Sequence, residues 1–426
     1  MKYVLYDVIL HVSLLVTLPY FFIKMLTARK YREGITERLG FIRAQKLKGL
    51  SGGPVLWAHA VSVGETRAVM PLLRLFKQRH PAVKIAFSTV TQTGNRVAAK
   101  EGAGIIDALF YFPFDLSWTV KGAIKKTRPK VFLTVEKEIW PNLFLHLNRL
   151  KTPVIMVNGT ISERSCRRFI RFGFFFRGVF GMMQAFCART PEDMKRAVNA
   201  GVKKDSAFLT GNIKFDIRPP EVNASSLDAL KKALGLKAGD RVIVAGSTHR
   251  GEEEIILSAF KALSAELKGL KLILAPRHPE RFNEAEAVVK KSGLSWARRS
   301  SGTGADVVIL DTIGELMTVY SFADAAIVGG SFVEGIGGHN LLEPALLGKP
   351  VVCGPYLTTY LNMAEMLEAA GGGLRTEATG PAIAGALRKL LNDEQLRLRT
   401  GNAASAAVKA NRGAVQKTLD VIERYF

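Results

Sequence analysis

The chain has 426 residues, 48% of them hydrophobic, and a formal net charge of +23 at pH 7. That length exceeds what one hydrophobic core supports, so two domains are expected, and the composition excludes a disordered or low-complexity protein. The positive charge favours a polyanionic partner, which is a nucleic acid, an anionic membrane or a phosphorylated substrate. No zinc-finger, RNP-type or helix-turn-helix pattern is present, so we expect no nucleic-acid partner and favour a membrane or a phospholipid-like substrate.

The cysteines give no sign of a disulfide framework or a zinc site. There are only three, and no two of them have CxxC spacing. A reducing compartment is the simplest interpretation of this pattern.

The first segment of the chain is almost continuously apolar from residue 3 to residue 26, and is interrupted only by Asp7, His11 and Lys24. Its length suits a hydrocarbon layer of about 30 Å, and a basic run follows it at Arg29, Lys30 and Arg32. Positive charge flanking a membrane segment stays in the cytoplasm, so we expect the remaining chain on that side. A helix lying in the membrane interface and a cleaved signal peptide are the alternatives.

Phenylalanines and arginines alternate over residues 167–177. Such a mixture suits the boundary between lipid headgroups and acyl chains, where rings face the acyl region and guanidinium groups face phosphates. A core helix with arginines extending to the solvent explains the same pattern equally well.

From residue 54 onward, short apolar runs alternate with segments of helical spacing. A parallel sheet with helices on both faces is the arrangement that this pattern predicts. In the first half the predicted strands are 55–58, 83–87, 131–133 and 153–157, with a helix over 65–78. In the second half they are 241–245, 270–275, 307–310, 325–328 and 350–352.

The run Asp216 to Pro220 separates these halves, because two consecutive prolines continue no regular element. We therefore predict an α/β protein with two Rossmann-like, doubly wound domains and a membrane-anchor helix. The predicted parts are an anchor over 1–27, a first domain over 28–217, a second domain over 218–400, and a C-terminal helix over 401–426 that packs back across the domains.

Ligands of open α/β sheets bind outside the carboxyl ends of the strands. In the first domain Glu65 follows such an end and is a candidate general base, although a glutamate at a helix N-terminus also serves as a simple cap. Glu136 and Glu138 follow another strand end, where they either orient a substrate or form a solvated turn before a helix that starts at Pro141. Lys214, near the domain junction, is a candidate for contact with a phosphate or a sugar carboxylate.

In the second domain Arg277 and His278 come directly after a strand, which suits a phosphate ligand. Further along, Gly337 and Gly338 are expected to open a helix whose free N–H groups bind an anion. Glu343, one turn into that helix, is expected to accept hydrogen bonds from ribose hydroxyls. Together these features predict a nucleotide site.

Several cofactor signatures are missing from the sequence. No G-x-G-x-x-G motif follows the first strand of either half, and no G-x-x-x-x-G-K-[ST] motif is present. We therefore expect neither NAD(P) nor a P-loop ATP site. No D-x-D or clustered His/Asp set stands out either, so we expect no metal or other cofactor, with cationic side chains serving the leaving phosphate instead.

Eight strings of this sequence resemble the 3-deoxy-D-manno-octulosonic acid (Kdo) transferases, in the same order and from the anchor to the C-terminal helix. They are HAVSVGE, VEKEIWPN, GNIKFD, GSTHRGEE, PRHPERF, DTIGEL, VGGSFVEGIGGHNLLEP and GPY. The resemblance implies a GT-B fold and an inverting transfer of Kdo from CMP-Kdo to the lipid A precursor. It further implies that the enzyme acts at the cytoplasmic face of the inner membrane, with an anionic membrane surface as a partner.

The same resemblance implies roles for individual residues. Glu65 matches the catalytic base of the family, and Glu136 and Lys214 match its pair that stabilises the transition state. The positions matching its CMP contacts are Pro276, Arg277, Ile313, Gly314, Glu315, Asn340, Leu341, Leu342 and Glu343.

Two alternatives stay open at this point. One is another GT-B enzyme, such as a nucleotide-sugar 2-epimerase or a transferase with a different donor. An epimerase acts on a soluble substrate and does not need the anchor. The other is a non-catalytic protein that binds an anionic lipid or a nucleic acid through its basic surface.

Overall fold

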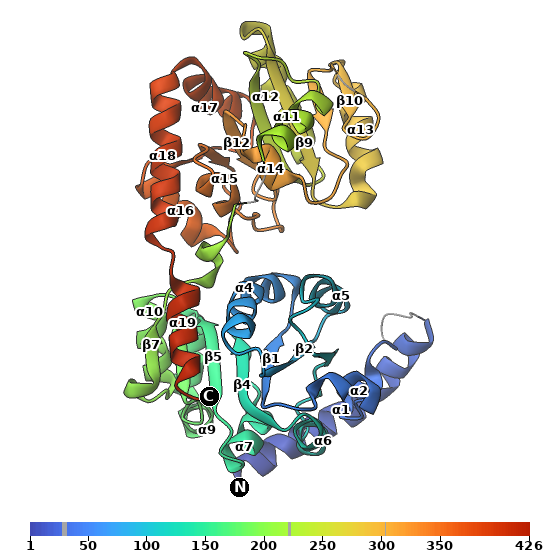
Figure 1. Ribbon diagram of the computed structural model, residues 1–426, viewed down its shortest axis with the longest axis vertical. Helices are drawn as coiled ribbons and strands as arrows, with labels where there is room; N and C mark the ends of the chain where they lie inside the picture. The colour runs from blue at the N-terminus through green and yellow to red at the C-terminus, as the bar shows by residue number, and fades with distance from the viewer. Residues whose placement is uncertain (28–31, 220–222, 303) are drawn as a thin grey trace. The chain divides into compact units, whose positions relative to one another are not determined.

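The computed structural model describes residues 1–27, 32–219, 223–302 and 304–426. It divides into two compact units, of which unit 1 comprises Met1–Asp216 and Arg412–Phe426 and unit 2 comprises Ile217–Asn411 (Figure 1). Each unit contains a seven-stranded, fully parallel sheet, with strand orders β3-β2-β1-β4-β5-β6-β7 and β10-β11-β9-β8-β12-β13-β14. In one sheet the strands run outward in sequence order on both sides of the β1–β4 pair, and in the other they do so on both sides of the β8–β12 pair, except that β10 lies outside β11. This change of direction is typical of doubly wound sheets, so the predicted pair of doubly wound α/β domains is confirmed.

Unit 1 is built mainly on strands that are buried on both faces, which explains their continuous apolar runs. Its strands are β1 Val55–Ala60, β2 Lys84–Thr89, β3 Ala108–Tyr111, β4 Pro129–Val135, β5 Val154–Gly159, β6 Ala185–Ala188 and β7 Ala207–Leu209. Its longer helices are α1 Lys2–Thr27, α4 Val63–Arg79, α5 Gln92–Glu101, α6 Ser117–Thr127, α7 Pro141–Arg149, α8 Glu163–Arg171, α9 Gly173–Phe180, α10 Pro191–Ala200 and α19 Ala414–Glu423. Shorter helical turns are α2 Ile35–Arg38, α3 Ala44–Leu47, η2 Lys48–Leu50, η3 Lys204–Ser206 and η4 Ile213–Asp216.

The helices of unit 1 cover the two faces of its sheet. Alternate residues of β1 point to opposite faces, so Trp57 packs with α6, α7 and α9, whereas Leu56 and Ala58 pack with α4, α5 and α19. The last helix, α19, thus completes the core of unit 1 although it follows unit 2 in the chain. Asp216 holds it there by accepting hydrogen bonds from the backbone N–H groups of Gly413, at 2.6 Å, and Val415, at 2.5 Å.

Unit 2 repeats the same architecture. Its strands are β8 Arg241–Thr248, β9 Leu270–Pro276, β10 Trp296–Arg298, β11 Val307–Ile309, β12 Ala325–Val328, β13 Val351–Cys353 and β14 Gly373–Arg375. Its helices are α11 Ala224–Ala233, α12 Glu252–Glu266, η5 Pro279–Arg281, α13 Phe282–Lys291, α14 Leu316–Tyr320, α15 Leu342–Leu346, α16 Leu361–Ala369, α17 Gly380–Asn392 and α18 Glu394–Ala410.

The end of the chain differs from the expected single helix over 401–426. It forms part of α18 in unit 2 and the whole of α19 in unit 1, with a break at 411–413. Gly413 has a φ of 94°, a conformation that ends regular helix geometry and suits glycine. Within the predicted linker, Asp216 closes η4, whereas Pro220 lies outside the described residues, as do Arg29 and Lys30 of the predicted basic run.

Helix α1 is the one helix in the described residues that is long and apolar enough to cross a membrane. Its first turns are nevertheless bound to unit 1. Asp7 accepts hydrogen bonds from the backbone N–H of Ser117 and the side-chain amide of Asn142, each at 2.8 Å, and Tyr6 donates to Asp115 at 3.0 Å. The remaining faces expose a long row of apolar side chains, including Val4, Leu5, Val8, Ile9, Val12, Leu15 and Val16.

The alternating Phe/Arg stretch lies on α8 and α9. The core-helix interpretation is confirmed for part of it, and contact with a membrane stays a prediction. Phe169, Phe175 and Phe176 pack against the core of unit 1, as a core helix requires. Phe172 and Phe174 are 44% and 74% exposed, and Lys2 of α1 donates a hydrogen bond to the Phe174 carbonyl. Part of this stretch therefore adjoins the start of α1 as an exposed apolar surface.

A tight approach in unit 2 yields a first prediction. A Cβ added to Gly246, in β8, would lie 1.9 Å from the hydroxyl oxygen of the fully buried Tyr320. We expect Gly246→Ala to lower the free energy of unfolding by about 1–3 kcal/mol, because Tyr320 has no room to withdraw. Chemical denaturation should measure this, and Gly385→Ala, where the added Cβ meets no atom within 4 Å, is the control that should not be destabilised.

Candidate functional site

In unit 1 the predicted site residues lie at the carboxyl edge of the sheet. Strands β1, β4 and β5 are neighbours, with His59 of β1 beside Thr134 of β4 and Val135 of β4 beside Val157 of β5. The segments that follow β1 and β4 carry Glu65 and Glu136, so the topology places both carboxylates at one edge. The structure thus brings together residues that are far apart in the sequence.

Glu65 lies in the first turn of α4. Ser62 is the N-cap, and its hydroxyl accepts a hydrogen bond from the Glu65 backbone N–H at 3.4 Å. The Glu65 carboxylate accepts hydrogen bonds from the Val61 backbone N–H, at 2.7 Å, and from the Ser62 hydroxyl, at 3.3 Å. This arrangement resembles a capping box. Glu65 therefore does cap the start of α4, and this structural role is compatible with a chemical one.

The same carboxylate has the electrostatics of a base. Burial raises the pKa of Glu65, and the charge of Glu136 raises it further, whereas the two hydrogen bonds and Lys214 act in the opposite direction. A raised pKa makes a carboxylate a better proton acceptor near neutral pH. Glu65 is therefore held in place and is more basic than an exposed glutamate.

Glu136 and Lys214 form an ion pair, with Lys214 Nζ 2.7 Å from Glu136 Oε1. Burial alone would raise the pKa of Glu136, but Lys214 and Arg189 lower it below its usual value, so this carboxylate stays ionised. Glu136 has a φ of 62°, which is uncommon outside glycine, and such conformations concentrate at functional sites.

Asn158, at the end of β5, was not predicted as a site residue. Its amide donates to Glu136 at 3.3 Å, and its side-chain oxygen accepts from the Ile213 backbone N–H at 3.1 Å. It therefore connects the two segments that carry the ion pair. Nothing in the local sequence distinguishes it from an ordinary strand-end asparagine.

Glu138 joins the cluster as a third carboxylate. Burial raises its pKa to about 7, and the charges of Glu65 and Glu136 add to that rise. The predicted solvated turn is thus a partly buried group of acids in which Glu138 carries a proton near neutral pH for part of the time.

Two aromatic side chains beside this group have unpartnered polar atoms. His59 is fully buried, stacks on Phe112 with ring centroids 3.7 Å apart, and has a pKa lowered to about 3 by burial. Among the described residues, His59 Nε2 and Trp140 Nε1 have no hydrogen-bond partner. Both belong to segments that the sequence singled out, although neither residue was named as a candidate.

In unit 2, nitrogen-bearing side chains gather from the segments that follow β8, β9 and β12. Arg277 and His278 directly follow the end of β9. His249, after β8, lies with its Nε2 2.7 Å from Nε2 of His339, and the two rings are stacked 4.9 Å apart. Burial lowers the pKa of His249 to about 4 and that of His339 to about 3, and the nearby Arg277 contributes to both shifts. An anion placed here would meet several nitrogen atoms.

The loop after β12 differs from the expected helix opening at its glycines. Gly337 and Gly338 have φ values of 88° and 86°, so they form turns, and α15 starts only at Leu342 and is five residues long. The expected helix N-terminus at the glycines is therefore wrong, because left-handed backbone cannot begin a right-handed helix. Glu343 lies in the first turn of α15 and accepts a hydrogen bond from the Asn340 amide at 3.1 Å.

The remaining predicted CMP contacts differ in what they offer. The side chains of Pro276, Leu341 and Leu342 are buried, so only their backbones are suited to polar contact with a ligand. Ile313 is 77% exposed, next to Gly314 with its φ of 96°. Glu315 accepts a hydrogen bond from Arg299 at 3.2 Å.

Within the part of the chain that the structure describes, no group of three or more His, Cys, Asp or Glu side chains is arranged to hold a metal ion. In the acidic cluster of unit 1, Glu136 is paired with Lys214, and Glu65 accepts hydrogen bonds from Val61 and Ser62. The three cysteines are buried and free.

Comparisons with known proteins identify the family. Residues 33–217 match the family model described as 3-deoxy-D-manno-octulosonic-acid transferase. The chain is 35% identical over 412 residues to the 3-deoxy-D-manno-octulosonic acid transferase of Haemophilus influenzae, covering 95% of this chain and 94% of that protein. The chain belongs to the Kdo transferase family. The 3-deoxy-D-manno-octulosonic acid transferase of Chlamydophila psittaci is 32% identical to this chain, and the match covers 88% of this chain and 86% of that protein.

Solved structures support the fold of this Kdo transferase. A glycosyltransferase from Rickettsia africae superposes with a TM-score of 0.60 at 13% identity, covering 88% of this chain and 98% of that one. A UDP-GlcNAc 2-epimerase from Neisseria meningitidis superposes with a TM-score of 0.58 at 14% identity, covering 87% of this chain and 99% of that one. The expected GT-B fold is confirmed.

Proposed function

We propose that this Kdo transferase moves Kdo from CMP-Kdo to the lipid A precursor, with inversion at the anomeric carbon, at the cytoplasmic face of the inner membrane. The observation that carries the proposal is the unit 1 cluster. Glu65 is a carboxylate fixed by hydrogen bonds, and its pKa is raised. It lies close enough to the Glu136–Lys214 ion pair for both charges to affect that pKa. This is the pattern expected of a general base beside groups that stabilise developing charge.

The reaction follows from those groups. Glu65 removes the proton from an acceptor hydroxyl, and that oxygen forms a bond to the anomeric carbon of Kdo while the bond from this carbon to the CMP phosphate oxygen breaks. Attack from the face opposite the leaving group inverts the configuration. Glu136, kept ionised by Lys214, stabilises the positive charge that develops on the sugar.

The donor is assigned to unit 2. In this proposal Arg277, after β9, binds the CMP phosphate and the Asn340–Glu343 segment binds the nucleoside; the position of Arg277 at a strand end supports the first role. The roles of Pro276, Ile313, Gly314, Glu315, Leu341 and Leu342 rest on their match to the family's motifs. We propose that no metal is needed, because cationic side chains serve the leaving phosphate.

We assign membrane attachment to α1. Its first turns are bound to α6 and α7 through Asp7, whereas most of its apolar side chains are exposed. A helix bound to the protein in this way fits an orientation along the membrane surface better than a free span. The exposed Phe172 and Phe174 extend this surface.

The decisive test is to incubate the purified full chain with labelled CMP-Kdo and lipid A precursor and to determine the mass and anomeric configuration of the product. The expected product carries added Kdo in the inverted configuration, with one CMP released for each sugar. Binding of the acceptor without release of CMP would instead favour the non-catalytic lipid-binding alternative.

Arg277 yields the next prediction. We expect Arg277→Gln to raise KM for CMP-Kdo by about 10- to 100-fold, because hydrogen bonds to charged groups contribute roughly 1.5–3 kcal/mol each. Steady-state kinetics with varied donor measures it. Arg399→Gln removes an exposed arginine from α18 of the same unit and should leave KM unchanged. An unchanged KM in the Arg277 variant would remove this residue from the donor site.

A further inference from the structure

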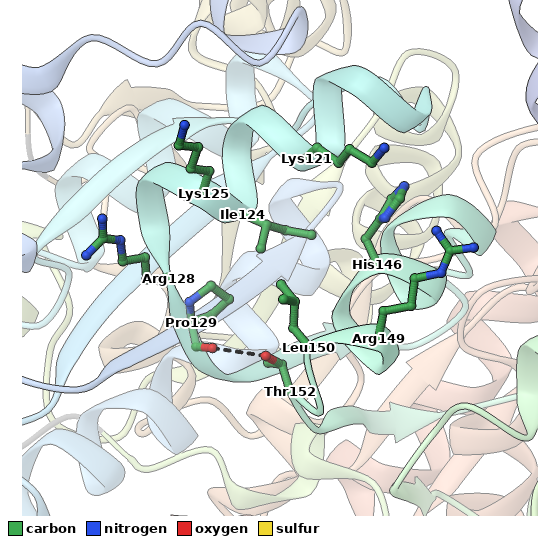
Figure 2. Close-up of a pocket in the computed structure, with 9 residues that line it drawn as sticks. All are labelled: Lys121, Ile124, Lys125, Arg128, Pro129, His146, Arg149, Leu150 and Thr152. Carbon is green, nitrogen blue, oxygen red and sulfur yellow. Dashed lines mark hydrogen bonds between the residues drawn. The ribbon is translucent and has the colours of Figure 1, made fainter.

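A hollow in unit 1 lies away from the acidic cluster of Glu65, Glu136 and Glu138. It has a volume of about 600 Å³ and lies between the C-terminal parts of α6 and α7 (Figure 2). One wall is Pro129, the first residue of β4, whereas Glu136 follows the other end of that strand. A strand of this length spans about 20 Å, so the hollow lies at the amino edge of the sheet and Glu65 and Glu136 lie at the opposite edge.

The rim of this hollow is cationic. It is formed by Lys121, Lys125, Arg128, His146 and Arg149. Figure 2 shows their nitrogen-bearing ends spread around a centre occupied by apolar side chains. Among the described residues, no carboxylate forms an ion pair with the lysines or arginines of this rim. Elsewhere in unit 1, by contrast, Lys77 is paired with Asp107 and Arg67 with Glu101.

Helix dipoles explain only part of this charge. Lys125 and Arg149 lie in the last turns of α6 and α7, where a cation stabilises the helix end. Lys121 lies one turn earlier, outside the range of that effect. Burial lowers the pKa of His146, and repulsion from the positive charges of Lys121 and Arg149 lowers it further. An anion in the hollow would relieve that repulsion.

The floor and edge of the hollow are apolar. Ile124 and Pro129 are buried, and Leu150 is 63% exposed at the opening. A free phosphate ion gains nothing from contact with an exposed leucine side chain, because the ion has no apolar surface to bury. An amphiphile with an anionic headgroup and an apolar remainder matches both the rim and the edge.

The hollow adjoins the helix that we assign to the membrane. His146 lies with its Nε2 2.7 Å from the hydroxyl oxygen of Ser117, and the backbone N–H of Ser117 donates to Asp7 of α1. The exposed Trp118 follows directly on α6. A lipid in a leaflet that contacts α1 is therefore within reach of the cationic rim.

We propose that this hollow binds the phosphate headgroup of an anionic phospholipid of the membrane, separately from the acceptor substrate. The inference rests on the proposed attachment through α1 but not on the proposed chemistry of transfer. Its function would be to fix the rotation of unit 1 on the membrane, since one bound headgroup beside α1 defines which side of the unit faces the lipid.

The test uses the full chain and a short-chain phosphatidylglycerol kept below its micelle-forming concentration, with binding followed by calorimetry. We expect saturable binding of one lipid per chain and none of the matching phosphatidylcholine. The variant K121Q/K125Q/R149Q should bind on the order of a hundredfold more weakly, since each basic residue near an anionic lipid contributes roughly a factor of five.

The matched control removes the same charge from the other face of the sheet. Arg74 of α4, Lys100 of α5 and Lys417 of α19 are exposed, and R74Q/K100Q/K417Q should bind the lipid as the unaltered chain does. Equal losses in both variants would mean diffuse charge rather than a site. Equally tight binding of inorganic phosphate, or displacement by a short oligonucleotide, would also overturn the proposal.

Transfer assays in lipid-free detergent separate this inference from the proposed function. The hollow variant should keep its kcat and its KM for the lipid A precursor, because the hollow lies at the far edge of the sheet. A KM raised tenfold or more in that variant would place the acceptor in the hollow and overturn the phospholipid assignment. Loss of transfer in the unaltered chain would instead contradict the proposed function and leave the lipid-binding result standing.

Discussion

Glu65→Gln is expected to lower kcat by about 10²- to 10⁴-fold with little change in KM for either substrate, because a glutamine cannot accept the acceptor's proton. The amide oxygen of glutamine can still accept the hydrogen bond that Val61 N–H donates to the carboxylate. The variant therefore keeps the helix cap and removes only the base. Steady-state rates of CMP release measure the loss.

Glu65→Ala provides the comparison, because it removes the base together with the hydrogen bonds that the carboxylate accepts from Val61 and Ser62. We expect it to lose transfer to the same extent and also about 0.5–1.5 kcal/mol of stability, the net contribution of a typical hydrogen bond. Glu192→Gln, in the first turn of α10, is a control that should change neither property. If Glu65→Gln transfers Kdo at the full rate, Glu65 is a cap alone.

Lys214→Met is expected to lower kcat by about 100-fold and to shift its pH dependence. Lys214 lowers the pKa of both Glu136 and Glu65. Without it both carboxyls hold their protons to higher pH, so the acidic limb of the kcat profile should move upward. A profile measured across the acidic and neutral range tests both the size and the sign of this effect.

The ion pair also has a structural role that must be separated from its chemistry. Removing Lys214 alone leaves a largely buried carboxylate uncompensated, which costs roughly 1–3 kcal/mol. The double variant Glu136→Gln with Lys214→Met removes both charges and should recover most of that stability without recovering transfer. Recovery of both properties together would show that the pair only supports the fold.

The sequence predicted nine strands, β1, β2, β4, β5, β8, β9, β11, β12 and β13, because most of their residues are buried on both faces of a sheet. Within the predicted runs 241–245 and 325–328, residues 242–245 and 325–328 are continuously apolar and lie within β8 and β12. The strands β3, β6, β7, β10 and β14 escaped prediction. Each is only three or four residues long, and β7, β10 and β14 are also only partly buried. Their existence depends on pairing with a neighbouring strand rather than on their own composition.

The candidate site was predictable in position but not in detail. We could identify Glu65, Glu136 and Arg277 from their positions just after predicted strands, because in a parallel sheet the carboxyl ends of the strands lie at the same edge of that sheet. The distance between Glu136 and Lys214 depends on η4, and the raised pKa of Glu138 depends on burial by distant segments, so neither follows from spacing. The five-residue α15 was mistaken for a longer helix because turn glycines and helix-opening glycines look alike in a sequence.

The packing of α19 has a consequence for how the protein is made. Val415, Leu419 and Ile422 fill one face of the unit 1 core, yet they are translated after the whole of unit 2. When the first 216 residues have been translated, one face of the unit 1 sheet is therefore still partly uncovered. Unit 2 can fold during synthesis, whereas unit 1 closes only when its last helix emerges, so the half that carries the proposed base matures last.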